Sequence, residues 1–253
     1  MQALRIQPHT FEGWVGEIFS SFQGEGPLVG RRQVFVRLAG CNLNCYYCDT
    51  RRFHQLPMDC QIGAGRAALD NPLGVGGVMA AIHDLWVAGT HSVSMTGGEP
   101  LCQHRFLGSL ARTCQVSGYP VYLESNGYSV KRFEMVRDYI DFACIDLKLR
   151  SHRACSNESW ADLIENEIAC LRSAGEAGIY SIAKIVVTRG TSPFEIEEAC
   201  SKLGNPSALV IQPASGDAPP MEEVFRLHEL ASNYLGGEKV MVIPQVHRSM
   251  GIQ

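Results

Sequence analysis

The sequence lacks the features that would assign it to a membrane or to nucleic acid. No apolar run reaches the roughly 20 residues that a membrane-spanning helix needs. The first residues, MQALRIQPHTFEG, lack the continuous apolar core of a signal peptide. Positive charge is not in excess, because 22 Lys and Arg face 26 Asp and Glu, which gives a net charge of -4. We therefore expect a cytoplasmic protein with no nucleic-acid partner and no membrane.

The composition also excludes disorder and low-complexity structure. Hydrophobic residues make up 45% of the 253 residues and charged residues only 19%, which is the balance of a chain that can build a substantial core. Cysteine is not scarce, with 10 residues. Because thiols stay reduced in the cytoplasm, this number indicates metal or redox chemistry before disulfides.

Three of the cysteines lie close together and the others do not. Cys41, Cys45 and Cys48 fall in the short segment CNLNCYYC. The remaining ones are scattered singly, several in apolar segments such as DFACIDL and EIACLRS, where a buried thiol behaves as a small hydrophobe. We expect these to be packing residues: Cys60, Cys102, Cys114, Cys144, Cys155, Cys170 and Cys200.

Short β-rich runs alternate with helical patterns from residue 33 onward. The expected strands cover 33–38, 91–96, 120–124, 142–148, 181–187, 208–212 and 239–244. The expected helices lie around 76–89, 103–117, 129–138, 158–175, 193–203 and 219–235. Such alternation is typical of parallel βαβ units, so we predict one α/β domain, a partial barrel or open sheet of mostly parallel strands. Ligands of such folds bind at the carboxyl ends of the strands.

Two stretches interrupt this alternation. Residues 11–32 include the Gly-rich segment SSFQGEGPLVGRR before the first core strand. Residues 51–75 follow the cysteines, and we interpret them as an irregular insertion with some helix. Two interpretations of Arg51, Arg52 and His54 remain open, a surface for a partner or a solvated loop.

The spacing C-x3-C-x2-C directly follows the first expected core strand, so the three thiols share one loop at a strand end. Three thiolates can bind one soft metal centre. A structural zinc site needs four ligands, and His54 would be the candidate for the fourth. An electron-carrying iron-sulfur cluster also has four protein ligands, so a set of three indicates an iron left open for another ligand.

The triplet and the segment MTGGEPL after the next expected strand resemble the radical S-adenosylmethionine superfamily. That resemblance implies a partial (β/α) barrel, a 4Fe-4S cluster on Cys41, Cys45 and Cys48, and S-adenosylmethionine bound at its open iron. In the TGGEP segment, Glu99 offers a carboxylate to an ammonium group. The resemblance implies cofactor contacts at Tyr47, Asp49, Gly97, Gly98, Glu99, Ser125, Asn126, Asp146, Lys148, Gln212 and Pro213.

A closer resemblance covers about residues 17–253. The segments SFQGEGPLVGRRQVFVRLAGCNLNCYYCDT, TGGEPLCQ, ESNG, IDLK, VIQP and the closing IPQVH resemble the 7-carboxy-7-deazaguanine synthase family. This resemblance implies conversion of 6-carboxy-5,6,7,8-tetrahydropterin to 7-carboxy-7-deazaguanine with loss of ammonia. It also implies a single domain over 1–253, with 1–32 as a substrate-binding extension, a homodimer, and an external one-electron reductant of the flavodoxin or ferredoxin type.

The same resemblance assigns residues to the substrate and to magnesium. Thr50 matches a Mg2+ ligand, since hard cations take oxygen ligands. Arg37 suits a substrate carboxylate because its planar fork binds two oxygens at once. The implied substrate contacts are Phe22, Gln23, Gly24, Glu25, Arg37, Thr96, His247 and Gln253.

The sequence departs from the family pattern at several positions. Ser125 and Tyr128 stand where Thr is frequent, and Leu149 and Arg150 stand where Pro is common. Two other classes of function remain open at this point. One is a radical enzyme that activates a partner protein, which would lack QGEG and the closing PQVH. The other is a non-enzymatic iron-sulfur or zinc module.

Overall fold

The structure is a computed structural model that describes residues 11–63 and 65–252. Its main element is a ten-stranded sheet of order β12-β11-β10-β9-β8-β7-β3-β2-β4-β5. From β3 to β12 all neighbouring strands are parallel. The strands are β2 Val15–Phe22, β3 Arg32–Leu38, β4 Asp59–Ile62, β5 Ala67–Asp70, β7 Ser92–Gly97, β8 Val121–Ser125, β9 Phe142–Asp146, β10 Tyr180–Val187, β11 Ala208–Pro213 and β12 Val240–Val242.

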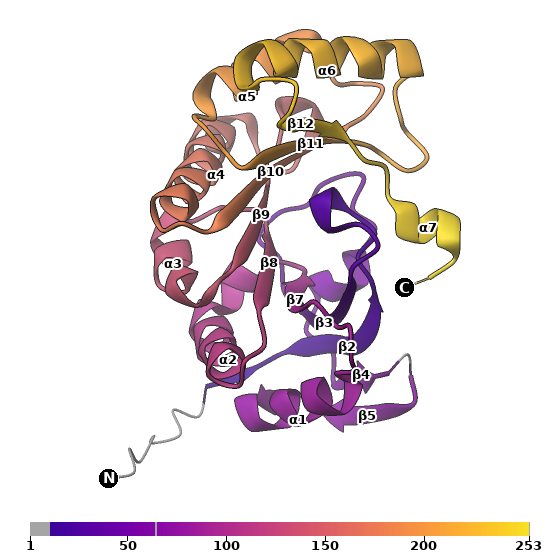
Figure 1. Cartoon of the computed structure of the whole chain (residues 1–253), viewed down its shortest axis with the longest axis vertical. Helices are drawn as coiled ribbons and strands as arrows, with labels where there is room; N and C mark the ends of the chain where they lie inside the picture. Colours follow the sequence, from indigo (N-terminus) through magenta and orange to yellow (C-terminus); the bar gives the residue numbers. More distant parts are fainter. Residues whose placement is uncertain (1–10, 64, 253) are drawn as a thin grey trace.

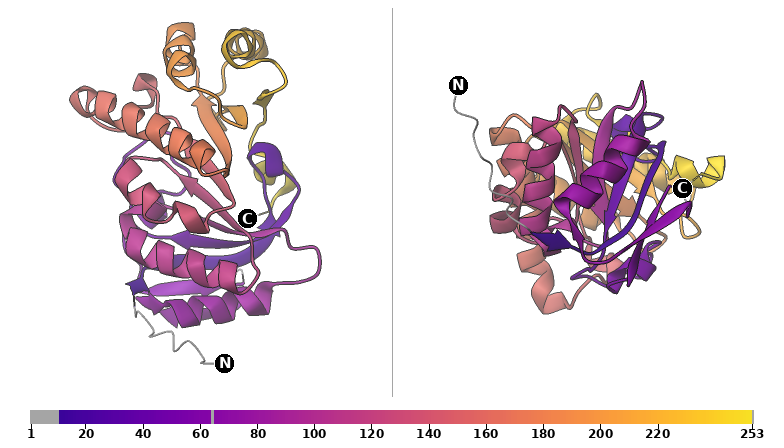
Figure 2. Two further views of the ribbon diagram at one scale, coloured as in Figure 1. Left: turned by 60° about the vertical axis from the view of Figure 1, so that its left-hand side comes forward. Right: turned by 90° about the horizontal axis from the view of Figure 1, so that it is seen from below.

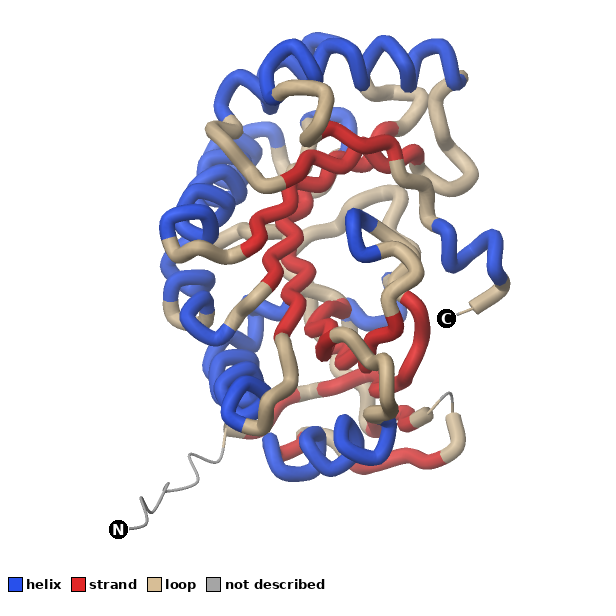
Figure 3. The backbone as a smooth tube through the Cα atoms, viewed as in Figure 1, coloured by secondary structure: helices blue, strands red, loops and turns tan. Residues whose placement is uncertain are grey.

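The sheet is curved and open rather than closed. Figure 1 shows the helices along its outer side, while the inner side faces the loops of the N-terminal third and α7. The two further views of Figure 2 and the tube of Figure 3 show the same division into an outer helical layer and an inner sheet. The helices are α1 Val75–Leu85, α2 His104–Val116, α3 Val130–Glu134, α4 Asn157–Glu176, α5 Pro193–Lys202, α6 Met221–Leu235 and α7 Val246–Met250.

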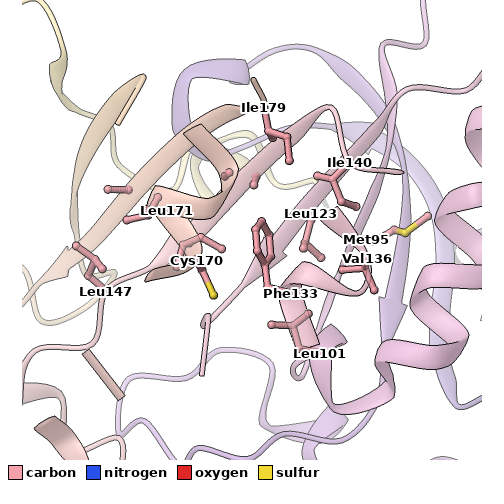
Figure 4. Close-up of a cluster of buried hydrophobic side chains, with 14 of the residues drawn as sticks. Met95, Leu101, Leu123, Phe133, Val136, Ile140, Leu147, Cys170, Leu171 and Ile179 are labelled. Carbon is pink, nitrogen blue, oxygen red and sulfur yellow. The ribbon is translucent and has the colours of Figure 1, made fainter. Parts of the chain in front are cut away.

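The helix α4 illustrates how local sequence sets this layer. Ser156 caps its first turn by accepting a hydrogen bond from Ser159 N. Trp160, Ile164 and Leu171 then recur at helical spacing and are buried. Figure 4 shows the core that results, in which Leu171 and Cys170 of α4 lie near Phe133 of α3 over the strands β7 and β8.

The predicted fold class is confirmed, because all the expected strands and the six expected helices are present and the core sheet is parallel. Sequence reasoning missed β2, which pairs antiparallel with β3. Most of β2 is buried on both faces, so it carries no alternating pattern. A further short helix, α7, was also missed.

The interpretation of residues 51–75 as an irregular insertion is wrong in part. The strands β4 and β5 form an antiparallel hairpin, and β4 extends the main sheet by pairing with β2. A second, two-stranded pairing joins β1 Glu12–Gly13 to β6 Leu73–Gly74. The hairpin escaped prediction because each strand has four residues, and AALD has low β propensity and is exposed.

A cavity at the carboxyl ends of the parallel strands

A cavity of about 200 Å3 lies where the parallel core strands end. Its wall contains every predicted site residue except two. Pro213 does not line it, and Gln253 lies outside the described residues. The predicted residues in the wall are Phe22, Gln23, Gly24, Glu25, Arg37, Cys41, Cys45, Tyr47, Cys48, Asp49, Thr50, Thr96, Gly97, Gly98, Glu99, Ser125, Asn126, Asp146, Lys148, Gln212 and His247.

The cysteine loop follows β3 and turns back at Gly40, whose φ of 86° favours glycine. Its three cysteines are free thiols that face the same cavity. Cys41, Cys45 and Cys48 share a small apolar cluster with Leu43 and neighbouring side chains. Because burial dominates, the pKa of Cys41 is raised to about 12 and that of Cys45 is raised as well. A bound metal would have to offset this cost to hold them as thiolates.

The spacing of the thiols separates a cluster from a single metal ion. Sulfur lies about 2.3 Å from zinc, so two sulfurs on one ion are at most about 4.6 Å apart. In the described part of the chain, the group whose ligand atoms all lie within 4.8 Å of one another is Glu25, Asp49 and His247. The cysteine sulfurs do not converge to that extent, although His54 Nε2 lies 3.5 Å from Cys48 Sγ. The three thiols are therefore not gathered at the spacing of a single zinc ion.

Two glycines of the TGGEP segment let it lie directly against the cysteine loop. A Cβ on Gly98 would stand 2.2 Å from Gly40 O, and one on Gly97 would stand 2.0 Å from Leu38 O. The backbone closes the contact, since Glu99 N donates to Gly40 O at 2.8 Å. Side chains at either position would push the two loops apart.

Glu99 joins this segment to the loop after β8. Its Oε1 accepts from Ser125 Oγ at 2.7 Å and from Leu101 N at 2.8 Å, and its Oε2 accepts from Asn126 N at 2.7 Å. Burial raises the pKa of Glu99 to about 7 despite these donors. The carboxylate thus holds two cavity loops together, and its predicted contact with an ammonium group stays a prediction.

A buried ion network crosses the cavity floor. Asp146 accepts from Lys148 Nζ at 3.0 Å and lies 3.0 Å from Lys184 Nζ, which reaches Glu25 Oε2 at 2.6 Å. Although burial opposes the positive charge, Asp146 raises the pKa values of both lysines above their usual range. Sequence reasoning missed Lys184, whose signal was a lone cation in the apolar strand SIAKIVV.

Two predicted substrate residues are held by partners that the sequence did not reveal. Gln23 Nε2 donates to Gln33 Oε1 at 3.0 Å and to Glu124 Oε1 at 2.9 Å. Arg37 Nε donates to Glu17 Oε1 at 2.7 Å. Burial raises the pKa of Glu124, which also lines the cavity. The signal for Glu124 was its place at the end of a strand, immediately before the predicted Ser125.

The C-terminal helix α7 brings the closing segment of the chain onto the QGEG segment. Val246 N donates to Gly24 O at 2.9 Å, and a Cβ on Gly24 would stand 2.3 Å from His247 Nδ1. Gln245 Nε2 bridges Glu25 Oε1 at 2.8 Å and Asp49 Oδ2 at 3.0 Å. The QGEG segment and the closing IPQVH segment, both of which carried the family resemblance, are therefore in direct contact.

The side-chain oxygen of Gln212 in the cavity wall lacks a hydrogen-bond partner among the described residues. This oxygen, Oε1, is buried. A buried polar atom left unpaired costs free energy. Together with the spaced thiols, this atom fits a polar cofactor seated in the cavity beside a cluster.

Comparison with known proteins assigns this arrangement to a class. Residues 36–203 match the Radical SAM superfamily. No helix among the described residues has the length and apolar character to cross a membrane. The chain belongs to the radical S-adenosylmethionine superfamily.

Two relatives match nearly the whole chain. A 7-carboxy-7-deazaguanine synthase of Methanothermobacter thermautotrophicus is 36% identical over 252 residues, which cover 94% of this chain and 96% of the relative. One of Geobacter sulfurreducens is 36% identical over 257 residues, covering 93% and 96%. The chain therefore belongs to the 7-carboxy-7-deazaguanine synthase family. Membership implies a 4Fe-4S cluster and S-adenosylmethionine as cofactors.

Solved structures agree with the fold. The crystal structure of QueE from Escherichia coli superimposes with a TM-score of 0.63 at 20% identity, covering 93% of this chain and 95% of that chain. A structure of TYW1 with a lysine-pyruvate adduct bound gives a TM-score of 0.54 at 14% identity, covering 82% and 75%. The two alternative classes of function gain no support from these relatives.

Proposed function

We propose that this protein converts 6-carboxy-5,6,7,8-tetrahydropterin to 7-carboxy-7-deazaguanine with loss of ammonia. The observation that carries the proposal is the shared cavity, whose wall contains the cysteine triplet, Gln23 to Glu25 of the QGEG segment and His247 of the PQVH segment. Relatives that match nearly the whole chain bear the name of this synthase. When bound, the cluster and S-adenosylmethionine supply a reductively generated carbon radical that abstracts hydrogen from the substrate.

The cluster and S-adenosylmethionine fit separate parts of the wall. Cys41, Cys45 and Cys48 would hold the cluster, leaving one iron without a protein ligand. Gly97 and Gly98 line the cavity and pack against the backbone of Leu38 and Gly40, so they hold the TGGEP segment beside the cysteines where the cofactor would bind. The unpaired Gln212 Oε1 can accept a hydrogen bond from a polar group of the cofactor. The remaining predicted contacts in the cavity stay proposals.

The substrate half of the cavity offers groups of matching chemistry. Glu25, Gln23 and Glu124 place carboxylate and amide oxygens together, which can accept from the amino-pyrimidinone edge of a pterin. Arg37 lies over the rings of Phe19 and Phe53, at 5.6 and 5.5 Å from their centroids. These contacts fix the plane of the guanidinium, so that its outer nitrogens can clamp the substrate carboxylate.

The helix α7 is proposed to cover one side of the cavity. The contact of Gly24 with His247 places α7 against the substrate segment. Exclusion of water strengthens the interactions of the buried charges and protects a reactive intermediate. His247 is therefore proposed as a substrate contact and as part of the cover.

We also propose that the protein binds Mg2+, forms a homodimer and works in the cytoplasm. The ligand atoms of Glu25, Asp49 and His247 lie within 4.8 Å of one another, next to Thr50. Carboxylate and hydroxyl oxygens suit Mg2+, which keeps several waters as further ligands. Family membership suggests a homodimer in the cytoplasm, and sedimentation equilibrium measures the first.

An anaerobic assay tests the proposed reaction. The reconstituted protein is reduced with dithionite in the presence of S-adenosylmethionine, Mg2+ and 6-carboxytetrahydropterin, and the product is followed by mass spectrometry. We expect 7-carboxy-7-deazaguanine to form. Cleavage of S-adenosylmethionine without this product would refute the substrate while leaving the radical chemistry intact, and omission of Mg2+ tests the ion separately.

A further inference from the structure

The cysteine loop presents an outer face as well as a cavity face. Exposed and buried residues alternate along it, so that Asn42, Asn44 and Tyr46 face solvent while Leu43 and Cys45 face inward. None of the three outward side chains carries a charge at neutral pH. Any strong charge on this face must therefore come from neighbouring segments.

Three exposed arginines from separate segments meet this outer face. Arg51 Nη2 donates to Cys45 O at 3.2 Å and to Tyr46 O at 3.0 Å. Arg153 precedes Ala154, whose carbonyl accepts from Asn44 N at 3.0 Å. Each contact ties an arginine-bearing segment to the cysteine loop itself.

The third arginine reaches the face through the loop before α6. Tyr46 donates its hydroxyl proton to Asp217 Oδ2 at 2.8 Å, and Arg189 N donates to Asp217 O at 2.9 Å. Asp217 is thus engaged with the tyrosine. The Arg189 side chain also lies on this loop, since its Nε donates to Ala218 O at 3.4 Å. The segments that contact the face thus carry three exposed arginines and one aspartate, a local excess of positive charge.

The backbone at Arg153 is unusual. Its φ of 48° lies in the left-handed region, and no other non-glycine residue in the described part of the chain has a positive φ. Such a conformation is strained for an L-residue with a Cβ, and Gly or Asn usually takes it. Arg153 ends the short helix η5 Arg150–His152, where its N–H donates to Arg150 O. The sequence therefore has an arginine at a position whose backbone conformation would suit glycine better.

The outer face is also close to the cavity. Tyr46 and Tyr47 pack edge to face with ring centroids 5.5 Å apart. Tyr46 is 41% exposed, whereas Tyr47 lines the cavity beside Cys45 and Cys48. Two adjacent rings therefore connect the surface to the interior. Electron transfer weakens steeply with distance, so this thin wall favours a donor that docks here.

We propose that the face formed by Arg51, Arg153 and Arg189 around Tyr46 is the docking surface for an acidic one-electron carrier protein. The proposal rests on the proposed function, which requires an external electron for the cluster. In the step, the carrier is oxidised by one electron and the cluster is reduced by one, and no bond forms or breaks. The chain has a net charge of -4, so an acidic carrier needs a local positive face within the screening length of about 8 Å.

Reduced flavodoxin, an acidic flavoprotein, is the probe for this surface. Its transfer to the reconstituted enzyme is followed anaerobically by stopped-flow absorbance, with dithionite as a small reductant that needs no docking. We expect Arg153→Glu to lower the second-order rate constant with flavodoxin on the order of tenfold. Dithionite-driven product formation should stay at the wild-type level. Arg153→Gly, which suits the left-handed backbone, should show a smaller loss of the flavodoxin rate.

Arg112→Glu on the exposed side of α2 is the matched control and should leave the flavodoxin rate unchanged. Equal flavodoxin rates for wild type and Arg153→Glu would overturn the docking surface. A parallel loss with dithionite would also overturn it, because the change would then act on the enzyme itself. Failure of the proposed function has a different signature, since wild-type protein would make no product even with dithionite.

Discussion

Lys184 Nζ lies 2.6 Å from Glu25 Oε2, which joins the strand β10 to the QGEG segment across 159 positions of the chain. Lys184 also lies 3.0 Å from Asp146 Oδ1. Although burial opposes ionisation, Lys184 holds the pKa of Glu25 below its usual range. Lys184 thus favours the charged form of Glu25, shares Asp146 with Lys148, and fixes the substrate segment against the sheet.

Replacing Lys184 with Met should destabilise the protein strongly. The substitution leaves Glu25 and Asp146 without their shared cation, and removal of one partner from a buried ion network costs about 3–5 kcal/mol. Chemical denaturation of the apoprotein measures the free energy of unfolding. Lys202→Met is the control, because Lys202 pairs with Glu198 at the surface and is 46% exposed, so its loss should be under about 1 kcal/mol. Similar losses for both variants would contradict the role of Lys184.

The parts of this site that the sequence predicted depend on local patterns. Cys41, Cys45 and Cys48 are recognisable by their spacing, and the parallel strands by their apolar runs. The partners of Gln23 and Arg37 were not predictable, because Glu124 and Glu17 reach them only through the tertiary fold. A carboxylate in a strand sequence carries no sign of the residue that it will face.

The contacts of the C-terminal segment were also not predictable from the sequence. The motif at His247 was visible, but Gln245, which bridges Glu25 and Asp49, was not singled out. Its role depends on α7 lying against residues more than half the chain away. Prediction therefore succeeded where a motif is continuous and failed where two distant segments complete each other.

His152 should weaken the fold in acid. Burial lowers the pKa of His152 to about 3, and its ring contacts Val186 O at 2.8 Å and Tyr47 at 3.1 Å. Between about pH 6.5 and 3 the unfolded chain binds a proton at His152 that the folded chain excludes, so the contribution of His152 to stability falls as pH falls, by about 1.4 kcal/mol per pH unit. Glu99, whose pKa is raised to about 7 from 4.5, acts in the opposite direction between these two values, because there the folded chain binds the proton.

Unfolding free energies measured across this pH range test the assignment. Relative to wild type, His152→Gln should change the slope by about 1.4 kcal/mol per pH unit, toward greater relative stability at low pH, although it lowers stability at neutral pH by the loss of buried contacts. His83→Gln alters an exposed histidine of α1 and should keep the wild-type slope. An unchanged slope in His152→Gln would show that another group controls the acid limb.

Only the cysteines of the triplet should be required for iron binding. Cys45→Ala removes one of the three thiols that face the cavity, so the reconstituted protein should lose its cluster absorbance and most of its iron and sulfide. Cys200→Ala removes a buried thiol of α5 that packs in the core, and should retain both. Comparable iron content in the two variants would contradict the assignment of the triplet.

The contact between the TGGEP segment and the cysteine loop should be sensitive to a single methyl group. In Gly98→Ala the new Cβ meets Gly40 O at 2.2 Å and Gly40 C at 2.8 Å, and backbone atoms cannot rotate away. The loops must separate, so S-adenosylmethionine should bind on the order of tenfold more weakly, the result of about 1.4 kcal/mol. Gly76→Ala is the matched control on α1, where no atom lies within 4 Å of the added Cβ and alanine favours the helix by about 1 kcal/mol. Isothermal titration of the reconstituted proteins measures the affinity. Equal affinities for the two variants would mean that the close approach at Gly98 has no part in forming the cofactor site.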